Sequence, residues 1–277
     1  LRDDFGVPVF YDSSKWGYYI TKPIFEPYEL RLMVDSIQSS KFITQTEAQT
    51  ISQKITKLGD VYTKESLNRV AYVADRVRSK NDSVVKDADR IHKAIAQNRK
   101  ISFRYFHYTP SKDNPKRYSK SGNVYIVSPY ALLWDNGNYY LYAYLTEKDA
   151  FRTFRVDRME NVSLLKEEKR EGAEHFYDFN ANEYAKTNFA MFEGENKFIT
   201  IKFVNTCMNA VVEKIGTDKI TYKNFDNSHF TVQMRIGINE QFYGWLCTFG
   251  NKAQVIEPQE QVDAFREYVN KITSLYD

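Results

Sequence analysis

The chain has 277 residues, a formal net charge of +3 at pH 7 and two cysteines. Its length allows two or three domains with cores of their own. Its nearly balanced charge excludes a protein that binds polyanions over its whole surface, so any such binding must be local. No apolar run approaches the ~20 residues of a membrane span, and no signal peptide is visible. We therefore expect a soluble, cytoplasmic protein whose Cys207 and Cys247 are buried, reduced thiols, with a disulfide as the alternative.

The first segment of the chain favours a short hairpin. Val7–Tyr11 and Tyr18–Ile20 read as strands around Asp12–Gly17, a turn-rich connection. Because the first residue is Leu1 and not methionine, we expect upstream residues to be missing.

Residues 24 to about 80 are predicted to be helical, and a further helix follows. Thr44–Glu47 is a capping box that opens the second of these helices. Each helix has apolar residues at i, i+3, i+4 or i+7, which together mark one buried face. The three faces consist of Leu30, Met33, Val34 and Ile37; of Ala48, Ile51, Ile55 and Leu58; and of Val84, Ala88, Ile91 and Ile95. The first two faces indicate a structured linker and form a core or a dimer seam, whereas the third helix leads into the strands that follow it.

The middle of the chain alternates as strands. Ile101–Phe106 and Tyr125–Tyr130 are separated by Ser111–Gly122, which is polar, basic and rich in helix and strand breakers. We predict a long loop there, whose lysines cover a bound phosphate or are simply solvated.

Two adjacent segments, Asn138–Tyr144 and Phe151–Arg158, carry four tyrosines and three arginines. Aromatic faces stack on bases, and guanidinium groups grip phosphate oxygens. In the first segment Tyr139 shares a face with Leu141 and Ala143, whereas Tyr140 lies on the opposite face. Phe154 and Val156 should face the core, which makes Arg155 the best-exposed guanidinium. The pattern predicts an anion site, and its alternative is an ordinary half-buried hairpin.

The last third of the chain predicts the order βαββαβ, which is the ferredoxin-like split motif, followed by a final helix. Gly216 and Gly250 would end its first two helices, and Pro258 would end its last strand. The predicted elements are Phe198–Val204, a helix from Asn205 to Ile215, Lys219–Phe225, Phe230–Ile238, Glu240–Phe249 and Ala253–Ile256.

These motifs resemble the WYL-domain transcriptional regulators of bacteria. Tyr139-Tyr140-Leu141 matches the Trp/Tyr-Tyr-Leu strand of that family, with Tyr139 in place of the tryptophan, and Phe154–Arg158 matches its Phe-Arg-hydrophobic-Asp-Arg strand. Gly244–Gly250 and the Val255–Pro258 strand end resemble the family's C-terminal extension. The resemblance implies a small Sm-like or SH3-like barrel that senses a nucleotide or nucleic-acid fragment and controls an attached winged helix-turn-helix.

The resulting fold prediction is an α+β protein in four parts. Residues 1–22 would be the wing remaining from a winged helix-turn-helix, or else a plain hairpin. Residues 23–82 would be the helical linker, 83–170 the WYL-like ligand-sensing barrel, and 195–277 the ferredoxin-like extension. With the recognition helix absent, we expect only weak, salt-sensitive binding to duplex DNA.

The predicted ligand-binding residues surround the two motif strands, and the predicted DNA contacts lie at the hairpin turn. The ligand set is Tyr105, His107, Tyr139, Tyr140, Arg152, Arg155 and Arg158, and the DNA set is Lys15 and Trp16. The four histidines have no partners at metal-ligand spacing, and no phosphate loop or nucleophile elbow is present. We therefore expect no metal, no cofactor and no enzymatic activity. His107 is the one candidate acid or base, and its alternative, which we favour, is a structural histidine.

The function predicted from these features is a ligand-responsive transcriptional regulator that acts as a homodimer, because two-fold operators need two readers. The alternative is a module that binds or processes nucleotides or single strands without regulatory output. That alternative would need a catalytic base or a larger excess of basic residues.

Overall fold

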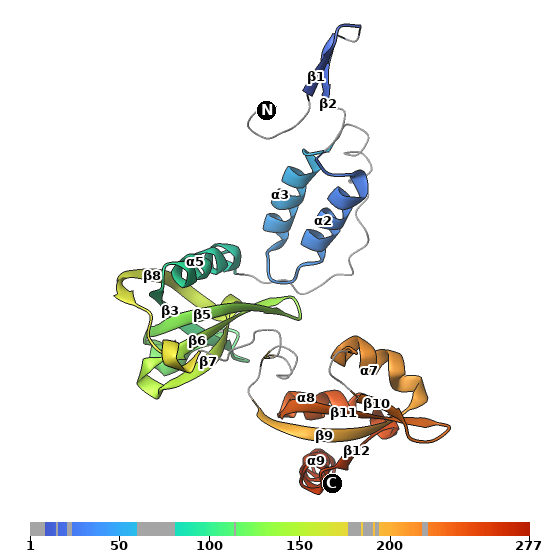
Figure 1. Cartoon of the computed structure of the whole chain (residues 1–277). Helices are drawn as coiled ribbons and strands as arrows, with labels where there is room; N and C mark the ends of the chain where they lie inside the picture. The colour runs from blue at the N-terminus through green and yellow to red at the C-terminus, as the bar shows by residue number, and fades with distance from the viewer. Residues whose placement is uncertain are drawn as a thin grey trace.

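The structure is a computed structural model that describes residues 9–14, 16–20, 24–59, 81–113, 115–176, 184, 191, 194–217 and 221–277. It confirms the α+β class, with one two-stranded sheet, one four-stranded sheet and one larger curled sheet in the described residues (Figure 1). Among these residues, none of the helices is both long enough and apolar enough to cross a membrane.

The N-terminal hairpin forms as predicted. Strands β1 (Val9–Asp12) and β2 (Gly17–Ile20) pair antiparallel, and the Ser14 amide donates a hydrogen bond of 2.9 Å to the Asp12 carboxylate within the turn. Of the two predicted DNA-contact residues, Trp16 is 86% exposed, and Lys15 lies outside the described residues.

The predicted linker contains two antiparallel helices, α2 (Pro27–Ser39) and α3 (Gln45–Thr56). The Thr44 side chain accepts a hydrogen bond from the Glu47 amide, which confirms the capping box. Leu58 was expected on the buried face of α3, but it lies beyond the end of the helix and is exposed. The remainder of the predicted linker, residues 60–80, lies outside the described part of the chain.

Helix α5 (Val84–Ala96) packs on the curled sheet. The strands of this sheet are β3 (Arg99–Tyr108), β4 (Lys116–Tyr118), β5 (Tyr125–Asp135), β6 (Asn138–Leu145), β7 (Ala150–Arg155) and β8 (Met159–Lys169). Strand order is β4-β3-β5-β6-β7, and β8 returns to pair with β3, so the first long strand lies between the second and the last. This is the path of a small Sm-like or SH3-like barrel that follows a helix.

The turns of the barrel follow from local sequence. Asn136 and Gly137 both have positive φ angles, 47° and 75°, which suit the tight turn between β5 and β6. Between β7 and β8, Val156–Arg158 form a single 3-10 turn, and Val156 remains fully buried in the barrel core. Arg158 is therefore held at a corner between two strands.

The predicted loop at Ser111–Gly122 is more ordered than expected. It contains β4, which pairs with β3 so that Phe106 faces Tyr118. Two of its lysines form ion pairs: Lys116 lies 2.6 Å from Glu160, and Lys120 lies 2.6 Å from Glu147. These two charges are neutralised within the protein, so they are poorly suited to cover a phosphate.

The C-terminal region has the predicted order of elements. Strands β9 (Glu195–Val204), β10 (Thr221–Asn224), β11 (His229–Ile238) and β12 (Ala253–Glu257) form an antiparallel sheet of order β10-β11-β9-β12. Helices α7 (Met208–Ile215), α8 (Glu240–Cys247) and α9 (Gln259–Thr273) contribute apolar residues to one core on this sheet. The order is that of a ferredoxin-like fold.

The two cysteines are free thiols. Cys207 is buried in the C-terminal core, as expected, but Cys247 at the end of α8 is exposed, contrary to the expectation that both are buried.

Candidate ligand-binding pocket

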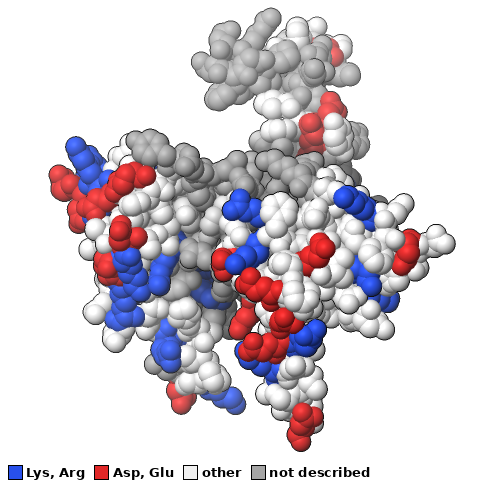
Figure 2. Space-filling view, turned by 60° about the horizontal axis from the view of Figure 1, so that its bottom comes forward, with Lys and Arg blue, Asp and Glu red and all other residues white. Residues whose placement is uncertain are grey.

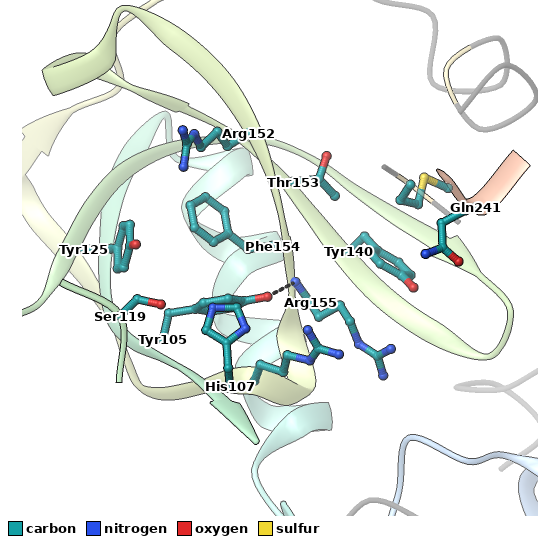
Figure 3. A pocket seen from close by; sticks show the side chains of 12 residues that line it. Tyr105, His107, Ser119, Tyr125, Tyr140, Arg152, Thr153, Phe154, Arg155 and Gln241 are labelled. Carbon is teal, nitrogen blue, oxygen red and sulfur yellow. Dashed lines mark hydrogen bonds between the residues drawn. The ribbon is translucent and has the colours of Figure 1, made fainter. Parts of the chain in front are cut away.

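A pocket of about 640 Å³ lies at β3, β6 and β7 of the barrel and is bordered by one residue of α8 (Figure 3). The lining combines three arginines and one histidine with aromatic and small polar side chains. Its residues are Tyr105, His107, Ser119, Tyr125, Tyr140, Arg152, Thr153, Phe154, Arg155, Arg158, Met191 and Gln241.

The electrostatic character of this pocket is one-sided. Among the described residues that line it there are three guanidinium groups and no carboxylate. A cavity of this composition favours a negatively charged ligand, because cationic side chains in a partly enclosed space attract anions more strongly than in bulk water. Six of the seven predicted ligand residues are brought together here.

Arg155 is not the best-exposed guanidinium, which corrects the prediction from the sequence. Its Nε donates to Asp157 Oδ1 at 3.0 Å and its Nη2 donates to Asp157 Oδ2 at 2.9 Å. The same Nη2 donates to Asn138 Oδ1 at 2.8 Å. Burial is the largest single effect on the pKa of Arg155 and lowers it. The hydrogen bond to Asp157 and the charges of Asp157, Tyr140 and Tyr105 together outweigh burial, so the pKa of Arg155 is raised. The Arg155 side chain is only 29% exposed.

Arg152 and Arg158 are held differently. Arg152 in β7 is exposed, and Arg158 in the 3-10 turn is partly buried. Within the described part of the chain, neither guanidinium lies within 4 Å of a carboxylate, in contrast to Arg155. Their donors are therefore better placed than those of Arg155 to bind an anionic ligand.

Tyr105 and His107 project from β3 into the same pocket (Figure 3). Their rings meet edge to face, with centroids 5.4 Å apart. The Tyr105 hydroxyl accepts a hydrogen bond of 3.2 Å from the Arg155 amide. Burial, followed by the charges of Arg158 and Arg117, lowers the pKa of His107 below its ordinary value near 6.5. The imidazole is thus largely neutral at pH 7, in part because its surroundings are cationic.

The two consecutive tyrosines of β6 lie on opposite sides of the sheet. Tyr140 lines the pocket, and its ring centroid is 5.9 Å from the Arg155 guanidinium. Tyr139 was included in the predicted ligand set, but it is not part of the pocket lining. Its ring packs instead against Phe42 and Trp134, with centroid distances of 5.3 Å and 4.6 Å.

Some lining residues were not predicted from the sequence. Ser119 belongs to the basic segment, and Thr153 lies between two predicted residues, so both could have been found by their positions. Gln241 lies in the first turn of α8 in the C-terminal region, and no local pattern in the sequence connects it with the barrel. The sequence also gave no separate reason to select Tyr125 or Met191.

A metal centre finds no support in the described residues, which contain no group of three His, Cys, Asp or Glu side chains close enough to hold an ion. His107 is accompanied in the pocket by arginines and tyrosines, which do not form a typical metal site.

Models of two known domain families match the sequence. The sequence model of the WYL domain matches residues 87–164, and the model of the WCX domain matches residues 198–273. Together, the two matches cover more than half of the chain. The search of the curated proteins found no match.

Two solved structures are similar to this chain at 15% sequence identity. Proteasome accessory factor B/C (PafBC) of Arthrobacter aurescens aligns with 95% of this chain and 39% of its own, with a TM-score of 0.31. A CRISPR Cas-related protein aligns with 90% of this chain and 71% of its own, with a TM-score of 0.42. The chain thus spans about two fifths of the length of PafBC.

Proposed function

Because the chain belongs to the WYL-domain regulators and carries a WCX domain after its WYL domain, we propose that its WYL domain binds a nucleotide or a nucleic-acid fragment. In this proposal, ligand binding controls the binding of DNA by a winged helix-turn-helix. The protein regulates transcription as a homodimer, and it has no catalytic role.

The observation that carries this proposal is the pocket with three arginines and no carboxylate among its described lining residues. Its volume of about 640 Å³ falls within the usual range for sites that bind small molecules, roughly 300–1,000 Å³. Arg152 and Arg158 would hold phosphate oxygens, and the Tyr140 ring would offer a face to a base. Arg155 would contribute its Nη1 group, the nitrogen not used in its bonds to Asp157 and Asn138.

A route from this pocket to the linker is suggested by β6. Tyr140 lines the pocket on one side, and Tyr139 contacts Phe42 on the other. Phe42 lies between α2 and α3, so a ligand that shifts β6 would press on the linker helices. Such transmission requires that the ligand bind one arrangement of these elements better than another.

In this proposal, the part of the described chain that contacts DNA is the β1–β2 hairpin. We propose that it is the wing of a DNA-binding domain, in which the exposed Trp16 contacts the sugar-phosphate backbone. Phosphate contacts position a protein on DNA, whereas base contacts in a groove give sequence specificity. The wing alone would therefore bind duplex DNA weakly and with little selectivity.

The ligand part of the proposal is tested by isothermal titration of the whole chain with the dinucleotide d(TpT) and with ATP. Arg158→Gln should weaken binding by about 1.5–3 kcal/mol, the usual contribution of a hydrogen bond to a charged group. Arg266→Gln is the matched control, because Arg266 is an exposed arginine on α9 outside the pocket. Equal affinities for the wild type and Arg158→Gln would remove this pocket from the proposal.

A further inference from the structure

The sheet of the WCX domain has one covered face and one open face. The apolar residues of α7, α8 and α9 pack with Ile201, Phe203, Val232 and Met234, which all point to the same side of the sheet. The strand residues between these positions point to the other side, where no described helix covers them. The open face thus consists of alternate residues of β9, β10, β11 and β12.

Two aromatic rings stand on this open face. Phe198 in the central strand β9 is 67% exposed and lies opposite Arg235 of β11. Phe225, just after β10, is 55% exposed, and the Lys202 ammonium lies 5.3 Å from its ring centroid. Two exposed phenylalanine rings on one uncovered face of a sheet form an apolar feature that a partner could contact.

Cationic side chains surround these rings. Lys202, Lys223 and Arg235 all point to the open face, in register with Thr231 and Gln233. Within the described part of the chain none of the three lies within 4 Å of a carboxylate, whereas Lys197 on the covered face is paired with Glu195 at 2.7 Å.

The open face carries few acidic side chains. Glu257 in the edge strand is the one carboxylate among its described strand residues, and it accepts a hydrogen bond of 3.1 Å from Thr200. The chain as a whole has a formal net charge of only +3, and Lys and Arg are interspersed with Asp and Glu on the face of the molecule seen in Figure 2.

We propose that the open face of the WCX sheet binds single-stranded nucleic acid, at a site separate from the WYL pocket. Exposed aromatic rings on a four-stranded sheet can stack on unpaired bases, and nearby cations can contact the phosphates between them. A double helix hides the faces of its bases and could use only the charges. A second copy of the chain is less suitable, because cations and polar groups separate the two rings and like charges would meet across a two-fold axis.

This site differs from the WYL pocket in what it can hold. The pocket is a cavity that suits one or two nucleotides, whereas the sheet face is open at both ends. Phe198 and Lys202 are four residues apart along β9, which corresponds to roughly 13 Å. The sheet site therefore requires an oligonucleotide and should be nearly insensitive to a mononucleotide.

The experiment measures fluorescence anisotropy of the whole chain with labelled oligo(dT) and oligo(U) twelve-mers, with a blunt DNA duplex for comparison. Phe198→Ala should weaken binding of the single strands by roughly fivefold to a hundredfold, the range found for loss of one stacked base. The double variant K202Q/R235Q should reduce the slope of log K against log salt by about 1.4. Tyr276→Ala and Lys252→Gln are matched controls, because they remove an exposed ring and an exposed charge elsewhere in the same domain.

The outcomes separate this site from the pocket. In a background of Arg158→Gln, Phe198→Ala should still weaken binding of the twelve-mers, and it should leave the affinity for d(TpT) unchanged. A preference between oligo(dT) and oligo(U) would identify the type of strand. The proposal is overturned if both sheet variants bind the twelve-mers as the wild type does. It is also overturned if Phe198→Ala acts by dissociating a dimer, which sedimentation would reveal.

Discussion

Tyr139 of the barrel packs edge-on against Phe42 of the linker, with ring centroids 5.3 Å apart and an interplanar angle of 82°. Trp134, which faces Tyr139 across the β5–β6 pairing, also contacts Phe42, at 4.8 Å. The next residue of β6, Tyr140, lines the pocket. Strand β6 thus lines the candidate pocket on one side and contacts the linker on the other, so a shift of this strand would change both the pocket and the contact with the linker.

The first prediction concerns this contact. In a background of W16F/W245F, the fluorescence of Trp134 should change when d(TpT) binds the pocket, because the ligand shifts β6 against Phe42. Phe42→Ala should abolish most of this change while altering the affinity for d(TpT) by less than about threefold, since Phe42 does not line the pocket. An unchanged fluorescence response in Phe42→Ala would show that β6 does not carry the signal.

The second prediction follows from the ion pair of Arg155. Asp157→Asn removes a negative charge beside the pocket and frees the Arg155 donors, so affinity for d(TpT) should rise by about threefold to tenfold. Glu160→Gln is the control, because Glu160 is paired with Lys116 and does not line the pocket. A weaker affinity in Asp157→Asn, with the fold intact by circular dichroism, would mean that Asp157 orients Arg155 for the ligand.

Much of the fold could be predicted from local patterns. The alternation of β6 correctly separated Tyr139 from Tyr140, because neighbouring side chains of a strand point to opposite faces. The capping box of α3 and the glycine at the end of α7 could also be predicted, because both satisfy the backbone groups at a helix end with residues close in sequence. The order of elements in the C-terminal region then indicated its topology.

The predictions that were wrong or missing concern side chains whose surroundings are set by tertiary contacts. Arg155 was expected to be exposed because its neighbours face the core, but its partner Asp157 lies in the turn that follows β7, a geometry that strand alternation does not describe. Lys116 and Lys120 were expected to be unpaired charges of a loop. Each pairs instead with a carboxylate that is distant in sequence, 44 residues away for Lys116 and 27 residues away for Lys120. Gln241 reaches the pocket from the C-terminal domain, and no periodic pattern in the sequence connects Gln241 with the strands of the barrel.

A third prediction tests two glycines that both have positive φ. A Cβ at Gly172 would lie 2.4 Å from Cγ of the Tyr144 ring, whereas a Cβ at Gly137 would meet nothing within 4 Å. Gly137→Ala should therefore lower the free energy of unfolding by about 1 kcal/mol, through backbone strain alone. Gly172→Ala should lower it by about 2 kcal/mol or more, because the Tyr144 ring must also move. Urea denaturation measures the free energy of unfolding of both variants. Equal losses would show that the Tyr144 ring moves aside without an energetic cost.

The fourth prediction concerns the proposed homodimer. Tyr28 and Leu32 are four residues apart on α2, Ile24 lies just before the helix, and all three side chains are exposed. A second copy of the chain would bury these side chains, since burial of a leucine contributes about 1.5–3 kcal/mol. Leu32→Lys should therefore shift the chain toward monomer in sedimentation at tens of micromolar, roughly the range of a modest interface. Leu275→Lys, at an exposed leucine near the C-terminus, should have no such effect. A wild-type chain that is monomeric at these concentrations would count against the dimer.

The last prediction is a pH dependence of ligand binding that arises from His107. In the free protein, burial and then the charges of Arg158 and Arg117 lower the pKa of this imidazole. A bound anion offsets the arginine charges and raises the pKa, so the bound state takes up a proton more readily than the free state. Affinity should then be highest below the free-state pKa, where His107 is charged in both states. It should fall as pH rises through the higher pKa of the bound state.

The probe for this measurement must not titrate itself. A terminal phosphate has a second pKa near about 6, whereas the phosphodiester of d(TpT) keeps one charge throughout. Affinity for d(TpT) should therefore decline in the wild type as the pH rises from the acidic range through neutrality, and this decline should be lost in His107→Gln. If the His107→Gln variant keeps the full pH dependence, the imidazole does not sense the ligand. In that case a different group, or a change in the protein as a whole, must take up the proton.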